Sequence, residues 1–167
     1  MQSALRVWAR PEVLIVGRSS HTTGQGDLRY RAMAAGGLGV LAGEAGERVV
    51  FEVCAAESLI GRVLAELPEL GPVPCEARPM ADDVVDPMRE FLSWPIERFG
   101  SFELSVRGQD GQLTDRGGVQ FFDTAEGRFM VTTTVRPDGS RQRTFVPADG
   151  SDIERWLSDQ TTEALAR

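Results

Sequence analysis

Histidine occurs once in this chain, as His21, next to the hydroxyl residues Ser19, Ser20 and Thr22. An imidazole beside hydroxyls could act as a lone general base. With a single imidazole, however, neither a metal site of paired histidines nor a relay through a second histidine can be built. The favoured interpretation of His21 is therefore an exposed loop residue.

Two further groups could carry chemistry, and each has a simpler structural interpretation. Asp82, Asp83 and Asp86 lie at a predicted helix start, where carboxylates complement the helix dipole. Gly24-Gln25-Gly26 lacks the third glycine and the strand-to-helix setting of a dinucleotide fingerprint. The residues therefore predict no catalytic site, cofactor or metal, and they predict that the protein is not an enzyme.

The cysteines and tryptophans point to packing. Cys54 lies inside an apolar run at 49–56 and is predicted to be a buried thiol, and its spacing from Cys75 suits no zinc site. Trp8, Trp94 and Trp156 are predicted on apolar helical faces, which favours core packing. Trp8, near the terminus, could instead mark an exposed patch.

Composition narrows the class of partner. The 167 residues carry a net charge of −7, which argues against binding to nucleic acid or to an anionic membrane surface. No apolar run approaches the roughly 18 residues that a membrane-spanning helix needs, so no membrane insertion is expected. We expect no signal peptide and a cytoplasmic location. All 18 basic residues are arginine, which fits a GC-rich coding genome.

The first half is predicted to form strands followed by a helix. Gly36-Gly37 suits a hairpin because glycine tolerates a positive φ, whereas Arg18–Asp27 is predicted to be a polar loop. Ser58 starts a helix that Pro68 ends. The predicted strands are 12–17, 28–34, 38–42 and 48–55, and a short helix is predicted at 2–10.

The second half follows the same order. Phe102, Leu104 and Val106 alternate with polar residues, as in a strand with one buried face. Turns are predicted at Asp110-Gly111 and at 136–139. Ser151 and Glu154 form a predicted capping box for a last helix that buries residues 153, 156, 157, 164 and 165. The predicted strands are 102–107, 118–123, 128–135 and 142–146.

The two halves resemble each other. Moving residues 46–64 forward by 93 positions gives eight identities in nineteen, where about one or two are expected by chance. We therefore predict a single α+β domain of two strand-strand-strand-helix halves with a pseudo-twofold relation and an antiparallel sheet flanked by helices. The repeats are placed at about 1–68 and 100–167, and a connector at about 69–99 is helical over 81–99, with Met88, Phe91 and Leu92 on its apolar side.

The stretch 117–157 resembles the C-terminal part of the EspG family, the secretion-associated chaperones of ESX (type VII) systems. The similar features are FDT-x-x-GR at Phe122–Arg128, the PDG turn at Pro137–Gly139 and a VPAD strand end at Val146–Asp149. The segment from ARPE at 9–12 through Leu67 looks like the family's N-terminal half. The chain is thus identified as a short actinobacterial relative of the family.

The resemblance implies a cytoplasmic chaperone that binds a PE–PPE heterodimer by the apolar tip of the PPE helical hairpin. In the family the loop between the first two strands of the N-terminal half takes part in this grip, and by position that loop is Ser19–Gly26 here. The partner-binding residues that it implies, with charge-compatible neighbours on the next strand, are Ser19, Ser20, His21, Thr22, Thr23, Gln25, Arg29 and Arg31.

Two other hypotheses stay open. A chain that lacks the family's first segment would leave a sheet edge and helical faces uncovered, and a homodimer would cover them. Alternatively, the loop Ser19–Gly26 could belong to a small-molecule site or to an enzyme whose residues form no recognisable pattern.

Overall fold

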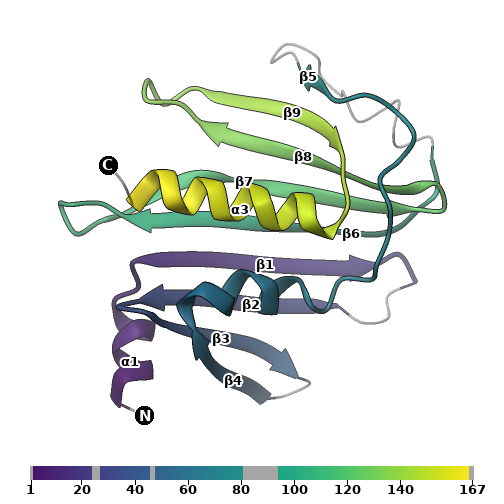
Figure 1. The fold of residues 1–167 in the computed structure, drawn as a ribbon. Helices are drawn as coiled ribbons and strands as arrows, with labels where there is room; N and C mark the ends of the chain where they lie inside the picture. Colours follow the sequence, from purple (N-terminus) through teal and green to yellow (C-terminus); the bar gives the residue numbers. More distant parts are fainter. Residues whose placement is uncertain (1, 24–26, 46–47, 81–93, 166–167) are drawn as a thin grey trace.

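A computed structural model describes residues 2–23, 27–45, 48–80 and 94–165. The strands form one sheet in the order β4-β3-β2-β1-β6-β7-β8-β9-β5, in which all neighbours are antiparallel (Figure 1). The strands are β1 Val13–His21, β2 Leu28–Ala35, β3 Leu38–Ala45, β4 Arg48–Ala55, β5 Arg78–Met80, β6 Ile96–Arg107, β7 Leu113–Thr124, β8 Gly127–Val135 and β9 Arg141–Pro147.

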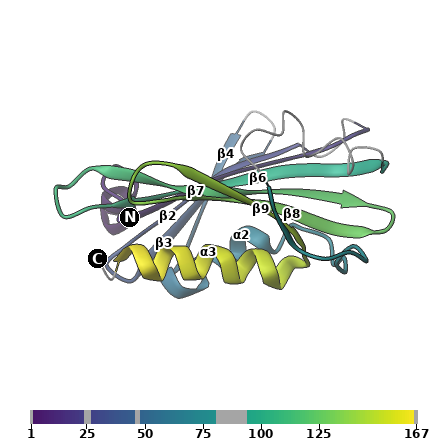
Figure 2. The ribbon, with the colours of Figure 1, turned by 90° about the horizontal axis from the view of Figure 1, so that it is seen from above.

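Two helices cover one face of the sheet. α2 (Leu59–Leu64) continues from a short 3₁₀ turn, η1 (Ala56–Ser58), and α3 (Gly150–Leu165) closes the chain. Figure 2 shows both on the same side, which we call the helix face. α1 (Gln2–Ala9) lies on the opposite, second face, where Val7 packs with Met33 and Val40. None of the helices in the described part of the chain is long and apolar enough to cross a membrane.

The main core lies between the sheet and the helix face, and both halves of the chain contribute to it. Strands β1 and β6 meet at the centre of the sheet, with Ile15 opposite Leu104. Both side chains are fully buried, together with Phe102, Val106 and Phe121. The helices add Leu59, Val63, Ile153 and Leu157 to the same cluster. The alternation of buried and outward residues in 102–107 is therefore confirmed.

The α+β class and the antiparallel sheet are confirmed. Each half contributes four long strands before its helix, which agrees with the four strands predicted in each half and corrects the description of each half as a strand-strand-strand-helix unit. The hairpin at Gly36-Gly37 is confirmed, with φ values of 56° and 81°. The turn at Asp110-Gly111 and the one ending in Gly139 are also present.

Two predictions about the centre of the chain are corrected. Strand β1 continues through His21, so residues 18–21 of the predicted loop are strand. Strand β6 begins at Ile96, within the segment predicted to be helical, and Trp94 lies in a bend before it. Residues 81–93, which include Asp82, Asp83, Asp86, Met88, Phe91 and Leu92, lie outside the described residues.

The capping box of the last helix is shifted by two residues. Oδ1 of Asp149 accepts hydrogen bonds from the backbone N–H groups of Ser151 (2.7 Å) and Asp152 (3.1 Å). In return, Oδ2 of Asp152 accepts one from the backbone N–H of Asp149 (3.0 Å). An aspartate pair thus performs the reciprocal capping predicted for Ser151 and Glu154. The side chains of residues 164 and 165 lie outside the described residues.

Candidate functional site

The predicted partner-binding residues lie at one end of the β1–β2 hairpin. Ser19 is buried, Ser20 and His21 are half-buried, and all three belong to β1. Thr22 and Thr23 form an exposed turn, and Gln25 lies outside the described residues. Arg29 and Arg31 are exposed on β2, as predicted from the alternation of that strand.

The turn after β1 is held by local hydrogen bonds. Both the backbone N–H and Oγ1 of Thr22 donate to the carbonyl of Glu97 (2.9 and 3.0 Å), which fixes the turn to the start of β6. Nδ1 of His21 lies 2.8 Å from Oγ1 of Thr23 and accepts a hydrogen bond from the Thr23 backbone N–H at 3.3 Å. The imidazole thus has a structural partner in the turn. Within the described part of the chain, no group of three His, Cys, Asp or Glu residues is placed to hold a metal ion.

A cavity of about 360 Å³ opens beside this hairpin, and we call it the Arg29 cavity. The strand registers place two rows of side chains across it. One row is polar and runs from Arg29 through Arg18 and Ser101 to Gln120. The other row places Ser20 opposite Phe99 and Phe99 opposite Phe122. The remaining lining residues are Ser19, Asp27, Leu28 and Gly100.

The polar row is ordered by one hydrogen bond, and the aromatic row is open to solvent. Nε of Arg18 donates to Oγ of Ser101 at 3.1 Å, and Ser101 is itself buried. Phe99 is 46% exposed. An exposed aromatic ring beside arginine side chains is typical of protein-binding surfaces. The structure therefore brings Ser19, Ser20 and Arg29 together in one hollow and leaves Arg31 in a neighbouring one with Val16 and Trp8.

Sequence reasoning missed Arg18, Phe99, Ser101, Gln120 and Phe122 as members of this surface. Arg18 was adjacent to the predicted segment, but Phe99 was assigned to a helix. The sequence does contain a signal that indicates two of these residues. If the strand predicted at 102–107 is extended towards the N-terminus with the same alternation, Phe99 and Ser101 lie on the face opposite Phe102.

A second surface is apolar and lies at the sheet edge. The groove between α1 and strands β3 and β4 has a volume of about 560 Å³. Its exposed side chains, with the adjacent Val49, form what we call the edge patch. On β4 these side chains are 54–57% exposed, and the ring of Trp8 meets that of Phe51 edge-on at 5.3 Å. The edge patch consists of Leu5, Trp8, Val49, Phe51 and Val53.

The sheet edge at β4 tests two expectations from the sequence, the burial of Cys54 and the exposure of Trp8. Cys54 was predicted to be a buried thiol, whereas it is only half-buried and the other side chains of β4 are exposed. Partial burial and the nearby Glu52 carboxylate raise the pKa of the Cys54 thiol, so it stays protonated at neutral pH. The suggestion that Trp8 marks an exposed patch agrees with its 38% exposure.

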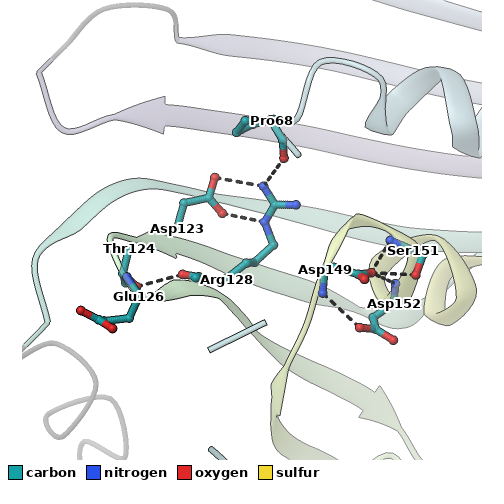
Figure 3. A network of polar contacts seen from close by, with 9 residues as sticks. Pro68, Asp123, Thr124, Glu126, Arg128, Asp149, Ser151 and Asp152 are labelled. Atoms are coloured by element: carbon teal, nitrogen blue, oxygen red, sulfur yellow. Dashed lines mark hydrogen bonds and ion pairs between the residues drawn. The ribbon is translucent and has the colours of Figure 1, made fainter. Parts of the chain in front are cut away.

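A buried ion pair fixes the strand pair β7–β8 to the connector. The guanidinium of Arg128 binds both carboxylate oxygens of Asp123, at 2.6 and 3.1 Å, and the Pro68 carbonyl at 3.1 Å (Figure 3). Backbone hydrogen bonds join Arg128 to Gly71, Val73 and Ala148. In the same turn, Oγ1 of Thr124 donates to the Gly127 carbonyl. The FDT-x-x-GR motif is thus a structural element that ties the connector to the second half.

These features define a domain with an aromatic and arginine-lined hollow and an apolar sheet edge, on a scaffold that includes the buried Arg128–Asp123 ion pair. The chain belongs to the EspG family, because a model of that family matches residues 1–159. EspG proteins are chaperones of type VII secretion and are not catalytic.

Comparison with solved structures agrees with this assignment. The chain is similar to the Mycobacterium tuberculosis type VII secretion system chaperone EspG5, solved in complex with a PE25–PPE41 dimer. The TM-score is 0.72 at 11% sequence identity, over 97% of this chain and 76% of that one. At this identity the similarity establishes the fold. A comparison with curated proteins gives no match.

Proposed function

We propose that this EspG-family chain is a cytoplasmic chaperone that binds a PE–PPE type pair and keeps it soluble for export. The family match over residues 1–159 carries the proposal. The solved complex of EspG5 with a PE25–PPE41 dimer supports it, since the two chains share a fold. An exposed apolar helical tip aggregates unless another surface covers it.

The client site that we propose is the Arg29 cavity with the turn after β1. It contains Ser19, Ser20 and Arg29 and adjoins His21, Thr22, Thr23 and Arg31, which were expected from the resemblance. Phe99 would cover apolar client side chains, whereas Arg18 and Arg29 would bind carbonyl or carboxylate oxygens at the end of a client helix. The neighbouring aromatic and polar rows suit a helical tip that is apolar on one side.

We also propose that the fold arose by duplication. Four strands and a helix occur twice, as β1–β4 with α2 and as β6–β9 with α3, and apart from the short edge strand β5 the sheet order is symmetric about the β1–β6 pair. The offset of 93 found in the sequence moves Arg48–Ala55, which is β4, onto 141–148, where β9 occupies 141–147. It likewise moves α2 into α3. The two ends that repeat in sequence therefore hold equivalent places in the sheet.

The direct test is co-expression with each PE–PPE pair encoded beside the chain, followed by affinity purification and light scattering. We expect a stable complex with one copy of each of the three proteins. Phe99→Asp and Arg29→Glu should each weaken the complex by about tenfold or more, because contacts at the centre of an interface dominate binding. Arg155→Glu, a charge reversal on the exposed side of α3, should leave it unchanged.

Two results would contradict the proposal at different levels. If no pair binds, the chaperone function for PE–PPE clients is wrong for this chain. If a pair binds but tolerates both Phe99→Asp and Arg29→Glu, the function stands and the assigned site is wrong.

A further inference from the structure

Strand β4 forms one end of the sheet and is unusually apolar for that position. Proteins normally protect edge strands with charges, proline or short length, because an open edge pairs with other strands. β4 is eight residues long, and every side chain on it except that of Cys54 is exposed. Valine and phenylalanine occupy its centre, and such residues on an open edge favour pairing with another strand.

The two faces of β4 differ in chemistry. Val49, Phe51 and Val53 lie on the second face, where they belong to the edge patch. Arg48, Val50 and Glu52 alternate with them and therefore lie on the helix face. Glu52 is already placed there by its ion pair with Arg62 of α2, at 3.4 Å.

We propose that β4 pairs antiparallel with β4 of a second copy of this chain, so that the two sheets form one continuous sheet. Directly opposite residues in an antiparallel pair point to the same face, so their two numbers must add up to an even number. This condition is met when a residue of β4 lies opposite itself on the twofold axis.

The charges on β4 select Val50 as the residue on the axis. With Val50 opposite Val50, Arg48 of each copy faces Glu52 of the other, giving two opposite-charge pairs. On the other face, Val49 then lies opposite Phe51 twice. Centring on Glu52 would oppose two carboxylates, and centring on Val49 or Phe51 would set a charged residue against Val50. Among the four registers centred on residues 49–52, only the Val50 register is complementary in both charge and apolar contact.

The same register also covers the rest of the edge patch. Leu5 and Trp8 flank β4 on the second face, so the two copies bring their edge patches together across the seam. Glu52 would lie between Arg62 of its own chain and Arg48 of the second copy. This dimer leaves the Arg29 cavity outside the pairing, so it does not depend on the proposed client.

The test uses charge reversal on the full chain, with sedimentation velocity over a wide range of concentration. The unmodified chain should move from one copy to two as concentration rises. Arg48→Glu alone and Glu52→Arg alone each convert two attractive pairs into two repulsive ones, so each should weaken self-association by about tenfold or more. Arg155→Glu, on α3, serves as the matched control and should associate like the unmodified chain.

The decisive step mixes the two single variants. In a mixed pair, the Arg48→Glu chain presents two carboxylates at positions 48 and 52, and the Glu52→Arg chain presents two guanidinium groups opposite them. The mixture should therefore recover dimers that neither variant forms alone. Melting curves of each variant show that it is folded before mixing. A chain that stays single at all concentrations overturns the proposal. Dimerisation that is unchanged in both single variants also overturns the proposal, and so does a mixture of the two variants that forms no dimer.

Discussion

Arg128 has the largest fully buried side chain among the described residues, and its charge is balanced by Asp123. The pair joins the β7–β8 turn to the connector through the Pro68 carbonyl. Removing one partner of a buried ion pair leaves an uncompensated charge. We therefore expect Asp123→Ala to lower the free energy of unfolding by about 3–5 kcal/mol, measured by urea denaturation.

A matched double variant separates the effect of the unpaired charge on stability from the effect of lost packing. Replacing both residues, as Asp123→Leu with Arg128→Met, removes the unpaired charge and should cost less than Asp123→Ala alone. A double variant that is less stable than the single one would show that the hydrogen bonds of Arg128 to the connector, rather than charge balance, hold this site.

Asp149 caps α3, and its contribution depends on pH. The hydrogen bond from the Ser151 hydroxyl, followed by backbone N–H groups, lowers the pKa of the Asp149 carboxyl. A group with a lowered folded-state pKa stabilises the fold above its unfolded pKa of about 3.9 and loses that effect as pH falls through the folded pKa. Asp149→Ala should cost about 1 kcal/mol at neutral pH, and less in acid, as measured by urea denaturation at each pH.

Asp149→Asn is the control for this prediction, since asparagine also caps helices but does not titrate in this range. It should retain most of the stability at neutral pH. If the difference between the unmodified chain and Asp149→Ala were the same at neutral pH and in strong acid, the capping carboxylate would not be its source.

At the scale of elements, local sequence signals predicted the hairpins correctly but did not indicate which strand lies at the edge of the sheet. Gly36-Gly37 and the turn at 136–139 demand particular φ values, which the residues themselves specify. Nothing local distinguishes an edge strand from a central one, so Cys54 on the apolar strand β4 was predicted to be buried although it is only half-buried. Phe99 and Gly100 join β6 because they pair with β1, a long-range contact that overrides local helical tendency.

A bulge in β7 gives an element-scale prediction. Gly117 has a φ of 102°, and a Cβ there would lie 1.8 Å from the Thr133 carbonyl oxygen of β8. The register shift between Leu104 and Ser105 leaves Arg116 as the extra residue of the bulge. Gly117→Ala should lower the free energy of unfolding by about 3 kcal/mol, the sum of backbone strain and forced displacement of β8.

Gly36→Ala is the matched comparison, because Gly36 has a φ of 56° and a Cβ there would meet no atom within 4 Å. It should cost only the strain of a left-handed alanine, about 1 kcal/mol. The free energy of unfolding of both variants is measured by urea denaturation. Equal losses would mean that β8 is displaced at the bulge without a measurable energetic cost.

At the scale of the whole molecule, the two halves of the chain share one sheet and one core. β1 pairs with β6 along its whole length, and the main core mixes both halves. Sequence reasoning located the eight long strands because hydrophobic alternation and turns are local. It could not place the Arg29 cavity, because its walls come from β1, β2, β6 and β7, which only the assembled sheet brings together.

This shared core predicts that neither half folds alone. Expressed separately, fragments 1–68 and 69–167 should each lack a cooperative thermal transition in circular dichroism, since Ile15 and Leu59 of one would be exposed without Phe102 and Leu157 of the other. Mixing them should restore strand signal and one transition, because the connector residue Val73 stays with Phe129 and Phe145 in the second fragment. A fragment that unfolds cooperatively by itself would instead make each repeat an independent domain, and the β1–β6 pairing would then be an interface between two domains rather than the centre of one.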